Sequence, residues 1–407
     1  MSEAARHDRL AGEPEAIYAT SWEHLADELR RLDTRLRQVV LEGRREPGVD
    51  PLAPFKGLVL SESEVLGLLE RGGDSESETS VSDTKQASKQ IETEIEQRRA
   101  AGLEAGVYLS LPRLAERFHL TRFEEQCLII CLAPELDCKY EKLYAYIQDD
   151  ATRRKPSVDL ILNLLCQSRA DRNAARVAFD PQATLLKCRL LHMTDSKADG
   201  PAPLLSRLLK LDDRIVNFLL GFNHIDERLE PFARMVSRET ESNQIDSEDS
   251  IYPRMRSFVE SHFRDRQSDN RNLIFYLQGP DIRDKGSLVE AVCRDLGLPL
   301  LVADLERMQS GSMPFEDAAW LLGRESALQP AALCLENIDA LAAEPDKSKS
   351  QLRSLLDALH AFSRLTFVLG SCDWHPQEML RDQIFIPVKF SLPRVAESKR
   401  LWERALE

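Results

Sequence analysis

The C-terminal part of the chain alternates short apolar runs with helical segments, and this rhythm constrains the fold more than any other feature. Five runs have the length and composition of buried strands, and the segments between them have helical periodicity. Successive parallel strands need a crossover connection, so the alternation predicts an α/β domain with a parallel sheet. The predicted strands are 272–279, 299–305, 331–338, 365–372 and 387–393, and the predicted helices are 287–296, 315–327 and 349–364.

The part of the chain before residue 238 is predicted to be mainly helical. Residues 21–43 repeat leucine or valine at spacings of three and four, as an amphipathic helix does. Thr121 and Glu124 have the spacing of a capping box at the start of a buried helix. Small helices followed by a β-hairpin within 183–194 resemble a winged-helix domain. Further helices are predicted at 88–103, 138–148, 157–167, 170–178, 201–220 and 224–237.

Polar stretches divide the sequence into segments. The serine-rich stretch 72–90 has almost no apolar residues and is predicted to be a disordered linker, and 238–250 is predicted to be a second linker. The predicted segments are an N-terminal helical segment (1–71), a helical and winged-helix-like domain (91–237) and the parallel-sheet domain (251–407).

Composition limits the location and partners of the protein. No stretch approaches the ~18 apolar residues of a membrane helix, and the polar N-terminus lacks the apolar core of a secretory signal. The net charge of −14 disfavours nucleic acid as a partner. Eight scattered cysteines without a CxxC pair fit a reducing compartment, so we expect a cytoplasmic protein without a membrane partner.

The first predicted strand leads into a variant of the phosphate-binding loop GxxxxGK[ST]. In that motif, backbone amides surround the phosphates, a lysine reaches the outer phosphate oxygens and a hydroxyl binds Mg²⁺. Gly279 and Lys285 have the motif spacing, but Asp284 replaces the second glycine and Gly286 replaces the Ser/Thr, with Ser287 one position late. Asp284 brings a carboxylate towards the triphosphate, which repels it. The candidate nucleotide-binding residues are Gly279, Pro280, Asp284, Lys285, Gly286 and Ser287.

The third predicted strand ends in Glu336 and Asn337, where an ATPase has two acids. Glu336 retains a carboxylate for Mg²⁺, whereas the amide of Asn337 has no basicity at neutral pH to activate water. Ser371 ends the next strand, where a polar residue positions water, and Arg381 precedes the last strand, where an arginine acts on a neighbouring subunit. These four residues are the candidate catalytic set, and Glu336 is the candidate metal ligand.

The order of these parts resembles the large subdomain of AAA-family ATPases. Upstream runs such as SWEHLADELRRLD, VYLSLPRLAERFHLTRFEEQCLIICLAPELD and LLKLDDRIVNFLLG are similar to a bacterial AAA subfamily with an N-terminal winged-helix region. In that subfamily, long members carry a degenerate ATPase module before an intact one. The resemblance implies that this chain is the degenerate module without the helical lid, with ATP and Mg²⁺ as its cofactors. It also implies partners: other AAA subunits or a catalytic ATPase module, a protein substrate, and a ring assembly.

Three functions fit these observations. The first is an ATP-hydrolysing AAA enzyme, and the second is a non-hydrolysing module that supports assembly or remodelling with a catalytic ATPase. The third is a winged-helix nucleic-acid-binding protein. The damaged loop and acidic pair favour the second. For the third function, a solvated helix face is the competing explanation of the basic cluster Arg153, Arg154, Lys155, Arg169, Arg172 and Arg176.

Overall fold

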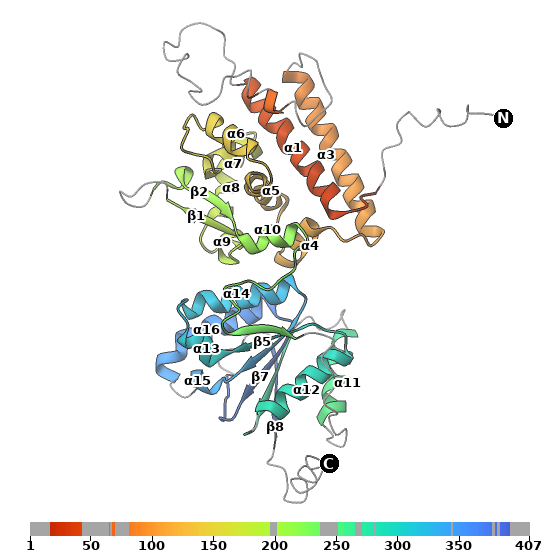
Figure 1. The fold of residues 1–407 in the computed structure, drawn as a ribbon, viewed down its shortest axis with the longest axis vertical. Helices are drawn as coiled ribbons and strands as arrows, with labels where there is room; N and C mark the ends of the chain where they lie inside the picture. The colour runs from red at the N-terminus through yellow and green to blue at the C-terminus, as the bar shows by residue number, and fades with distance from the viewer. Residues whose placement is uncertain are drawn as a thin grey trace, which may run out of the picture. The chain divides into compact units, whose positions relative to one another are not determined.

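The computed structural model describes residues 17–42, 65, 67–69, 81–195, 202–236, 251–264, 271–280, 282–342, 345–376, 379–380 and 383–390. Its internal contacts divide the chain into two units, unit 1 (Met1–Phe222) and unit 2 (Asn223–Glu407) (Figure 1).

Unit 1 is mainly helical and has one small sheet. Its helices are α1 (Ser21–Glu42), α3 (Val81–Glu104), α4 (Ser110–Phe118), α5 (Arg122–Leu136), α6 (Lys139–Ile147), α7 (Val158–Leu165), α8 (Arg169–Ala175), α9 (Thr184–Lys187) and α10 (Asp213–Leu219). The described residues of unit 1 also form two 3₁₀ turns, η3 (Arg176–Phe179) and η4 (Leu204–Ser206), and two strands, β1 (Leu191–Thr194) and β2 (Leu208–Leu211).

The N-terminal ends of several helices follow directly from the sequence. Thr121 and Glu124 form the predicted capping box of α5, in which each side chain accepts a hydrogen bond from the other residue's backbone amide. Ser157 caps α7, and Ser168 forms a second capping box with Asp171 at α8. The predicted helix at 88–103 is also present, but α3 begins at Val81, inside the stretch predicted to be a linker.

The small sheet gives unit 1 its wing. β1 and β2 pair antiparallel, with Leu191 opposite Leu211. The stretch before α7 joins the outer side of β2, because Leu209 N donates to Pro156 O (2.8 Å) and Val158 N donates to Arg207 O (3.0 Å). In chain order, a stretch that pairs with β2 is followed by short helices and then by the β1–β2 hairpin. This is the winged-helix arrangement that the sequence predicts.

The predicted helix at 201–220 is wrong in its first half. That stretch forms the 3₁₀ turn η4 and then β2, and the α-helix is limited to Asp213–Leu219. The run Leu208–Leu211 is apolar enough for either structure, and pairing with β1 buries alternate residues, which selects the strand. Asp212 then caps α10 by accepting a hydrogen bond from Arg214 N. The hairpin predicted within 183–194 therefore has its second strand outside that range.

Unit 2 is a six-stranded sheet with helices on both faces. Its strands are β3 (Ala233–Val236), β4 (Asn272–Gln278), β5 (Leu300–Asp304), β6 (Ala332–Glu336), β7 (Leu365–Gly370) and β8 (Gln383–Lys389). Its helices are α11 (Ile251–Arg264), α12 (Ile282–Asp295), α13 (Leu305–Ser310), α14 (Phe315–Leu328), α15 (Asp339–Ala342) and α16 (Pro345–Phe362). The strand order is β3-β5-β6-β7-β4-β8, parallel except for β3.

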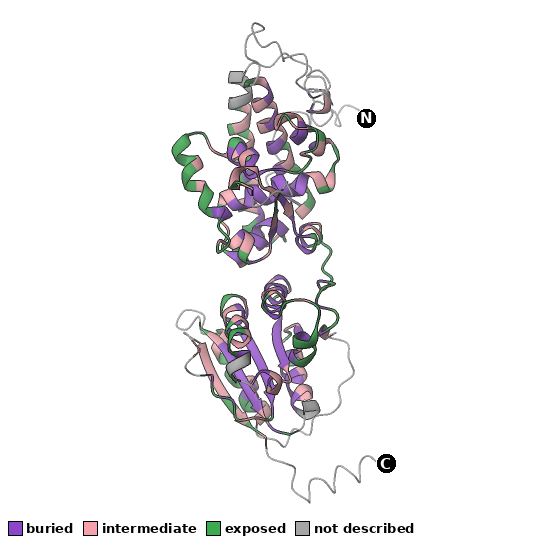
Figure 2. Ribbon diagram, turned by 90° about the vertical axis from the view of Figure 1, so that its left-hand side faces the viewer, coloured by how far each residue is buried: buried purple, intermediate pink, exposed green. Residues whose placement is uncertain are grey.

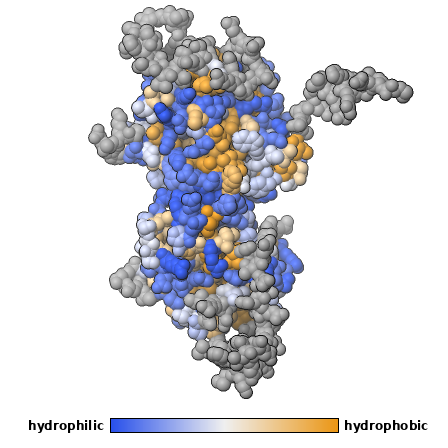
Figure 3. Space-filling view, in the orientation of Figure 1, coloured by the Kyte–Doolittle hydropathy of each residue, from blue (hydrophilic) through white to orange (hydrophobic). Residues whose placement is uncertain are grey.

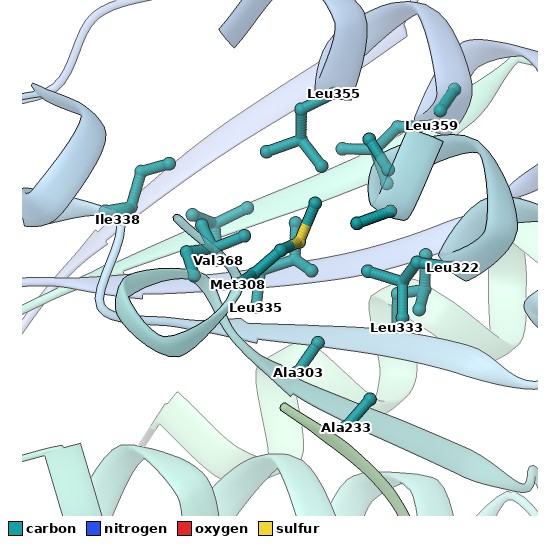
Figure 4. Packing of buried hydrophobic residues seen from close by; sticks show 14 of the residues in the cluster. Ala233, Ala303, Met308, Leu322, Leu333, Leu335, Ile338, Leu355, Leu359 and Val368 are labelled. Carbon is teal, nitrogen blue, oxygen red and sulfur yellow. The ribbon is translucent and has the colours of Figure 1, made fainter. Parts of the chain in front are cut away.

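Two apolar clusters lie on opposite faces of this sheet. One packs α11 and α12 against it through residues such as Val259 and Val292. The other packs α13, α14 and α16 against the opposite face, and Figure 4 shows Met308, Leu322 and Leu355 of this cluster meeting the strands. The central strands are buried and β8 at the edge is half-buried (Figure 2). The predicted parallel-sheet domain is therefore present, and its layering is compatible with a P-loop fold.

The boundary between the two parts of the chain differs from the prediction. Residues 224–237 were predicted to be the last helix of the N-terminal domain, but the stretch belongs to unit 2, and its described part, 224–236, ends in β3. β3 pairs antiparallel with β5, and Leu229 and Phe232 are buried in the core of unit 2. A four-residue strand with no turn signal has no clear periodicity, so only its tertiary pairing defines it. The predicted linker 238–250 lies outside the described residues.

In the described part of the chain, no helix is both long and apolar enough to cross a membrane. Hydrophilic residues cover much of the face that Figure 3 shows, with smaller apolar areas between them.

Candidate functional site

The carboxyl ends of β4, β7 and β6 lie next to one another at one edge of the sheet. β7 pairs with β4 on one side and with β6 on the other. Gly279, Ser371 and Glu336 therefore lie along the same edge, as the sequence predicts for residues that follow parallel strands. In open parallel sheets, this edge is where ligands bind.

Lys285 is the most constrained residue of the predicted loop. It lies in the first turns of α12, and its side chain is 1 % exposed. Its Nζ donates hydrogen bonds to Gly279 O (2.5 Å) and Gly370 O (2.8 Å). Gly279 N also donates to Gly370 O (2.9 Å). The ammonium group therefore joins the ends of β4 and β7 through main-chain carbonyls.

Gly279 is packed too tightly for any side chain. A Cβ built at this position would lie 2.8 Å from Phe390 Cβ, and Phe390 N donates to Gln278 O (2.7 Å). The residue that follows β8 thus covers the start of the loop. Pro280, the next loop residue, is exposed.

The remaining loop residues lie in α12. Gly286 faces the acidic strand, because a Cβ built there would lie 3.9 Å from Glu336 Oε1. The structure therefore brings the position of the missing hydroxyl next to the predicted magnesium ligand. Ser287 is half-buried in the same helix. Residue 284 is part of α12, but the side chain of Asp284 lies outside the described residues, so its repulsion of phosphate stays a prediction.

Glu336 is half-buried at the end of β6, opposite Asp304 of β5. Burial raises the pKa of Glu336 above its usual value; Asp304 and Glu290 raise it further, and Arg234 opposes them. Within the described residues, no group of three or more His, Cys, Asp or Glu side chains is arranged to hold a metal ion.

Asn337 occupies a turn directly after β6. Its backbone is left-handed, with φ of 61°, a conformation that asparagine tolerates better than most residues. The chain then enters α15 at Asp339. The left-handed turn therefore accounts for an asparagine at position 337.

Ser371 is held by a carboxylate that the sequence analysis missed. Its backbone N donates to Asp339 Oδ2 (2.9 Å) and its Oγ donates to the same atom (3.1 Å), while Cys372 N donates to Asp339 Oδ1 (2.7 Å). Burial alone would raise the pKa of Asp339, but these hydrogen bonds outweigh it, so the pKa lies below its usual value. Asp339 therefore remains charged and fixes Ser371. Arg381 lies outside the described residues.

Two more residues, Tyr276 and Phe390, contact the ends of β4 and β7 that Lys285 joins. The sequence analysis did not identify them as site residues. Tyr276 OH donates to Cys372 O (2.5 Å), and a Cβ at Gly370 would lie 2.9 Å from this hydroxyl. Phe390 covers Gly279, as described above. Asp339 had a detectable signal, an acid three residues beyond Glu336, whereas Tyr276 and Phe390 looked like ordinary strand residues.

These observations define a protein of two units, a helical unit with a β-wing and a three-layer α/β unit. The family model "Winged helix domain, variant" matches residues 7–233, which is more than half of the 407 residues. The chain belongs to this family. Among solved structures, a crystal structure of the FIGL-1 AAA domain is 13 % identical and covers 46 % of this chain and 68 % of its own, with a TM-score of 0.32. A likeness at this score carries no information about activity. No curated protein matches the chain.

Proposed function

We propose that unit 2 is a non-hydrolysing, AAA-like module that supports assembly or remodelling together with a catalytic ATPase. The observation that carries this proposal is the position of Lys285. A phosphate-binding lysine directs its ammonium group to phosphate oxygens. Here the same group is buried and bonds two main-chain carbonyls, Gly279 O and Gly370 O.

The residues at the strand ends do not fit a magnesium–triphosphate group. Gly286 offers no hydroxyl to the metal, although its position lies beside the carboxylate of Glu336. Phe390 packs against the glycine from which the loop would wrap the phosphates. Each feature alone lowers nucleotide affinity. Together they favour a site whose residues stabilise the sheet and do not bind nucleotide.

The same features support a role in assembly. In AAA rings, neighbouring modules share a nucleotide at their interface, so a module without turnover still supplies a surface to its neighbour. The winged-helix fold of unit 1 does not by itself imply nucleic-acid binding, because function depends on the site and not on the fold. Three arginines of the basic cluster in unit 1 form ion pairs, which lowers the positive charge available to bind nucleic acid. The pairs are Arg153 with Asp150, Arg154 with Glu141, and Arg172 with Asp159.

ATP turnover of the purified full chain tests the proposal. We expect phosphate release at least a hundredfold below the lower end of typical enzyme rates, which is about 1 s⁻¹, with no change in Lys285→Ala. Size-exclusion chromatography with and without MgATP should give the same elution volume. Phosphate release that Lys285→Ala abolishes would show an active enzyme instead.

A further inference from the structure

Helix α3 is attached to unit 1 with little apolar contact. It lies alongside α1 (Figure 1), and its buried residues at 86–104 are Ile95, at 0 % exposure, and Gly102, so Ile95 is the buried apolar side chain of this stretch. A 24-residue helix in a globular domain usually buries a continuous apolar stripe. α3 is therefore an element with low local stability compared with the buried α5.

Ion pairs replace the missing apolar contacts. Arg98 NH1 lies 2.7 Å from Asp27 Oδ2, and Arg99 NH1 lies 2.7 Å from Glu125 Oε2. The other charged contacts of α3 pair Glu94 with Arg30 (3.5 Å), Glu92 with Arg35 (3.6 Å) and Glu96 with Arg122. The attachment of α3 to α1 and α5 is thus mainly electrostatic.

A stripe of polar residues on α1 is buried beneath this contact. His24, Glu28 and Arg31 are 0 %, 0 % and 3 % exposed. His24 Nε2 lies 3.6 Å from Glu28 Oε1, too far for a hydrogen bond, and neither ring nitrogen has a hydrogen-bond partner among the residues that the structure describes. The ring contacts the edge of Tyr18, with 5.1 Å between centroids. A buried imidazole with both nitrogens unsatisfied is costly, and such groups call for a physical explanation.

Positive charges surround His24 from all three helices. Burial, together with the charges of the nearby arginines, lowers the pKa of His24 to about 3. Three helices contribute the charged groups near the His24 ring and Glu28. They are Asp27 and Arg31 on α1, beside Glu28 itself, Arg98 and Arg99 on α3, and Arg122 and Glu125 on α5.

We propose that α3 is a proton-released strap: protonation of the buried His24 expels α3 from α1 and α5 and exposes the polar stripe of α1. The docked helix holds Arg98 and Arg99 near the imidazole, and a positive charge on His24 repels both. Release of α3 removes these two arginines and lets water solvate the imidazolium. The ion pairs of α3 re-form when the ring loses its proton.

The sign of the pH effect follows from the depressed pKa. A histidine with a pKa near 6.5 when exposed and about 3 when docked favours docking fully above pH 6.5. Its contribution is lost progressively as the pH falls from 6.5 towards 3. Burial raises the pKa of Glu28, so Glu28 contributes with the opposite sign, and only a comparison with a His24 variant isolates the histidine.

Hydrogen exchange of the full chain, read by mass spectrometry at about pH 7.5 and pH 5.5 and corrected for intrinsic rates, tests this proposal. We expect protection of α3 to fall about tenfold more in the wild type than in His24→Gln. Peptides of α5 and β4 should keep their protection in both. The same pH dependence in both proteins, or equal loss of protection in α5, would overturn the proposal.

If His24→Gln does not fold, His24→Leu, which also lacks the titrating imidazole, takes its place in the comparison. A variant at Ile95 tests the attachment of α3 separately. Ile95→Ala removes the buried apolar anchor of α3 and leaves the charges in place. It should increase exchange of α3 at both pH values while retaining the acid-dependent increase. An acid response that is absent in Ile95→Ala would contradict the role of His24.

Discussion

Replacing Lys285 by alanine is expected to lower the free energy of unfolding of unit 2 by about 3–5 kcal/mol. The substitution leaves a cavity where the buried four-carbon stem lies, and it removes the ammonium donor from Gly279 O and Gly370 O. Lys285→Met fills most of that volume and loses only the donor, so it should cost about 1–3 kcal/mol. Urea-induced unfolding followed by circular dichroism measures both values.

An exposed lysine of the same unit provides the control. Lys349 on α16 is exposed, and Lys349→Ala should change the stability by less than about 0.5 kcal/mol. A lysine whose role is to bind phosphate contributes little to the nucleotide-free protein. If Lys285→Ala matched Lys349→Ala in stability, Lys285 would not be the structural link between β4 and β7.

Replacing Asp226 by alanine should destabilise unit 2 by a similar amount, about 3–5 kcal/mol. Asp226 Oδ2 lies 2.6 Å from Arg324 NH2, and the two side chains are 4 % and 0 % exposed. Removal of the acid takes a close negative charge away from a buried guanidinium. It also loosens the segment before β3, because Arg324 lies on α14 and Asp226 anchors that segment to it. Urea-induced unfolding measures the change.

Arg228 gives the matched control for this prediction. It also pairs with Asp226 (2.6 Å) but is 38 % exposed, so Arg228→Ala should cost less than about 1 kcal/mol. Burial alone raises the pKa of Asp226, but the hydrogen bonds from Arg228 and the charge of Arg324 lower it overall. The pair therefore stabilises the protein above about pH 4 and weakens at lower pH. Equal losses in Asp226→Ala and Arg228→Ala would contradict this account.

Local patterns were sufficient to predict most elements. Four of the parallel strands and the capping box at Thr121 were predictable because short apolar runs and helix caps carry their signals within a few residues. The fifth strand was predicted at 387–393, but β8 begins earlier, at Gln383, and ends at Lys389. β3 was not predictable, since Ala233–Val236 has no turn signal and depends on its pairing with β5. β2 was mistaken for a helix because its leucine-rich run fits the periodicity of a helix as well as that of a strand.

In the candidate site too, local sequence signals were predictive and contacts between residues far apart in the chain were not. The spacing of Gly279 and Lys285 identified the loop, and the ends of apolar runs placed Glu336 and Ser371 at one edge of the sheet. The direction of the Lys285 side chain was not predictable, because its acceptor Gly370 is 85 residues further along the chain. The contact of Asp339 with Ser371 spans 32 residues and has the same cause.

A calorimetric titration of the full chain with MgATP tests most directly whether the strand ends form a structural junction and not a nucleotide site. We expect no saturable heat at concentrations up to about 1 mM, which corresponds to a binding free energy weaker than about −4 kcal/mol. Saturable binding in the micromolar range that Lys285→Met abolishes, while the protein stays folded, would contradict the account.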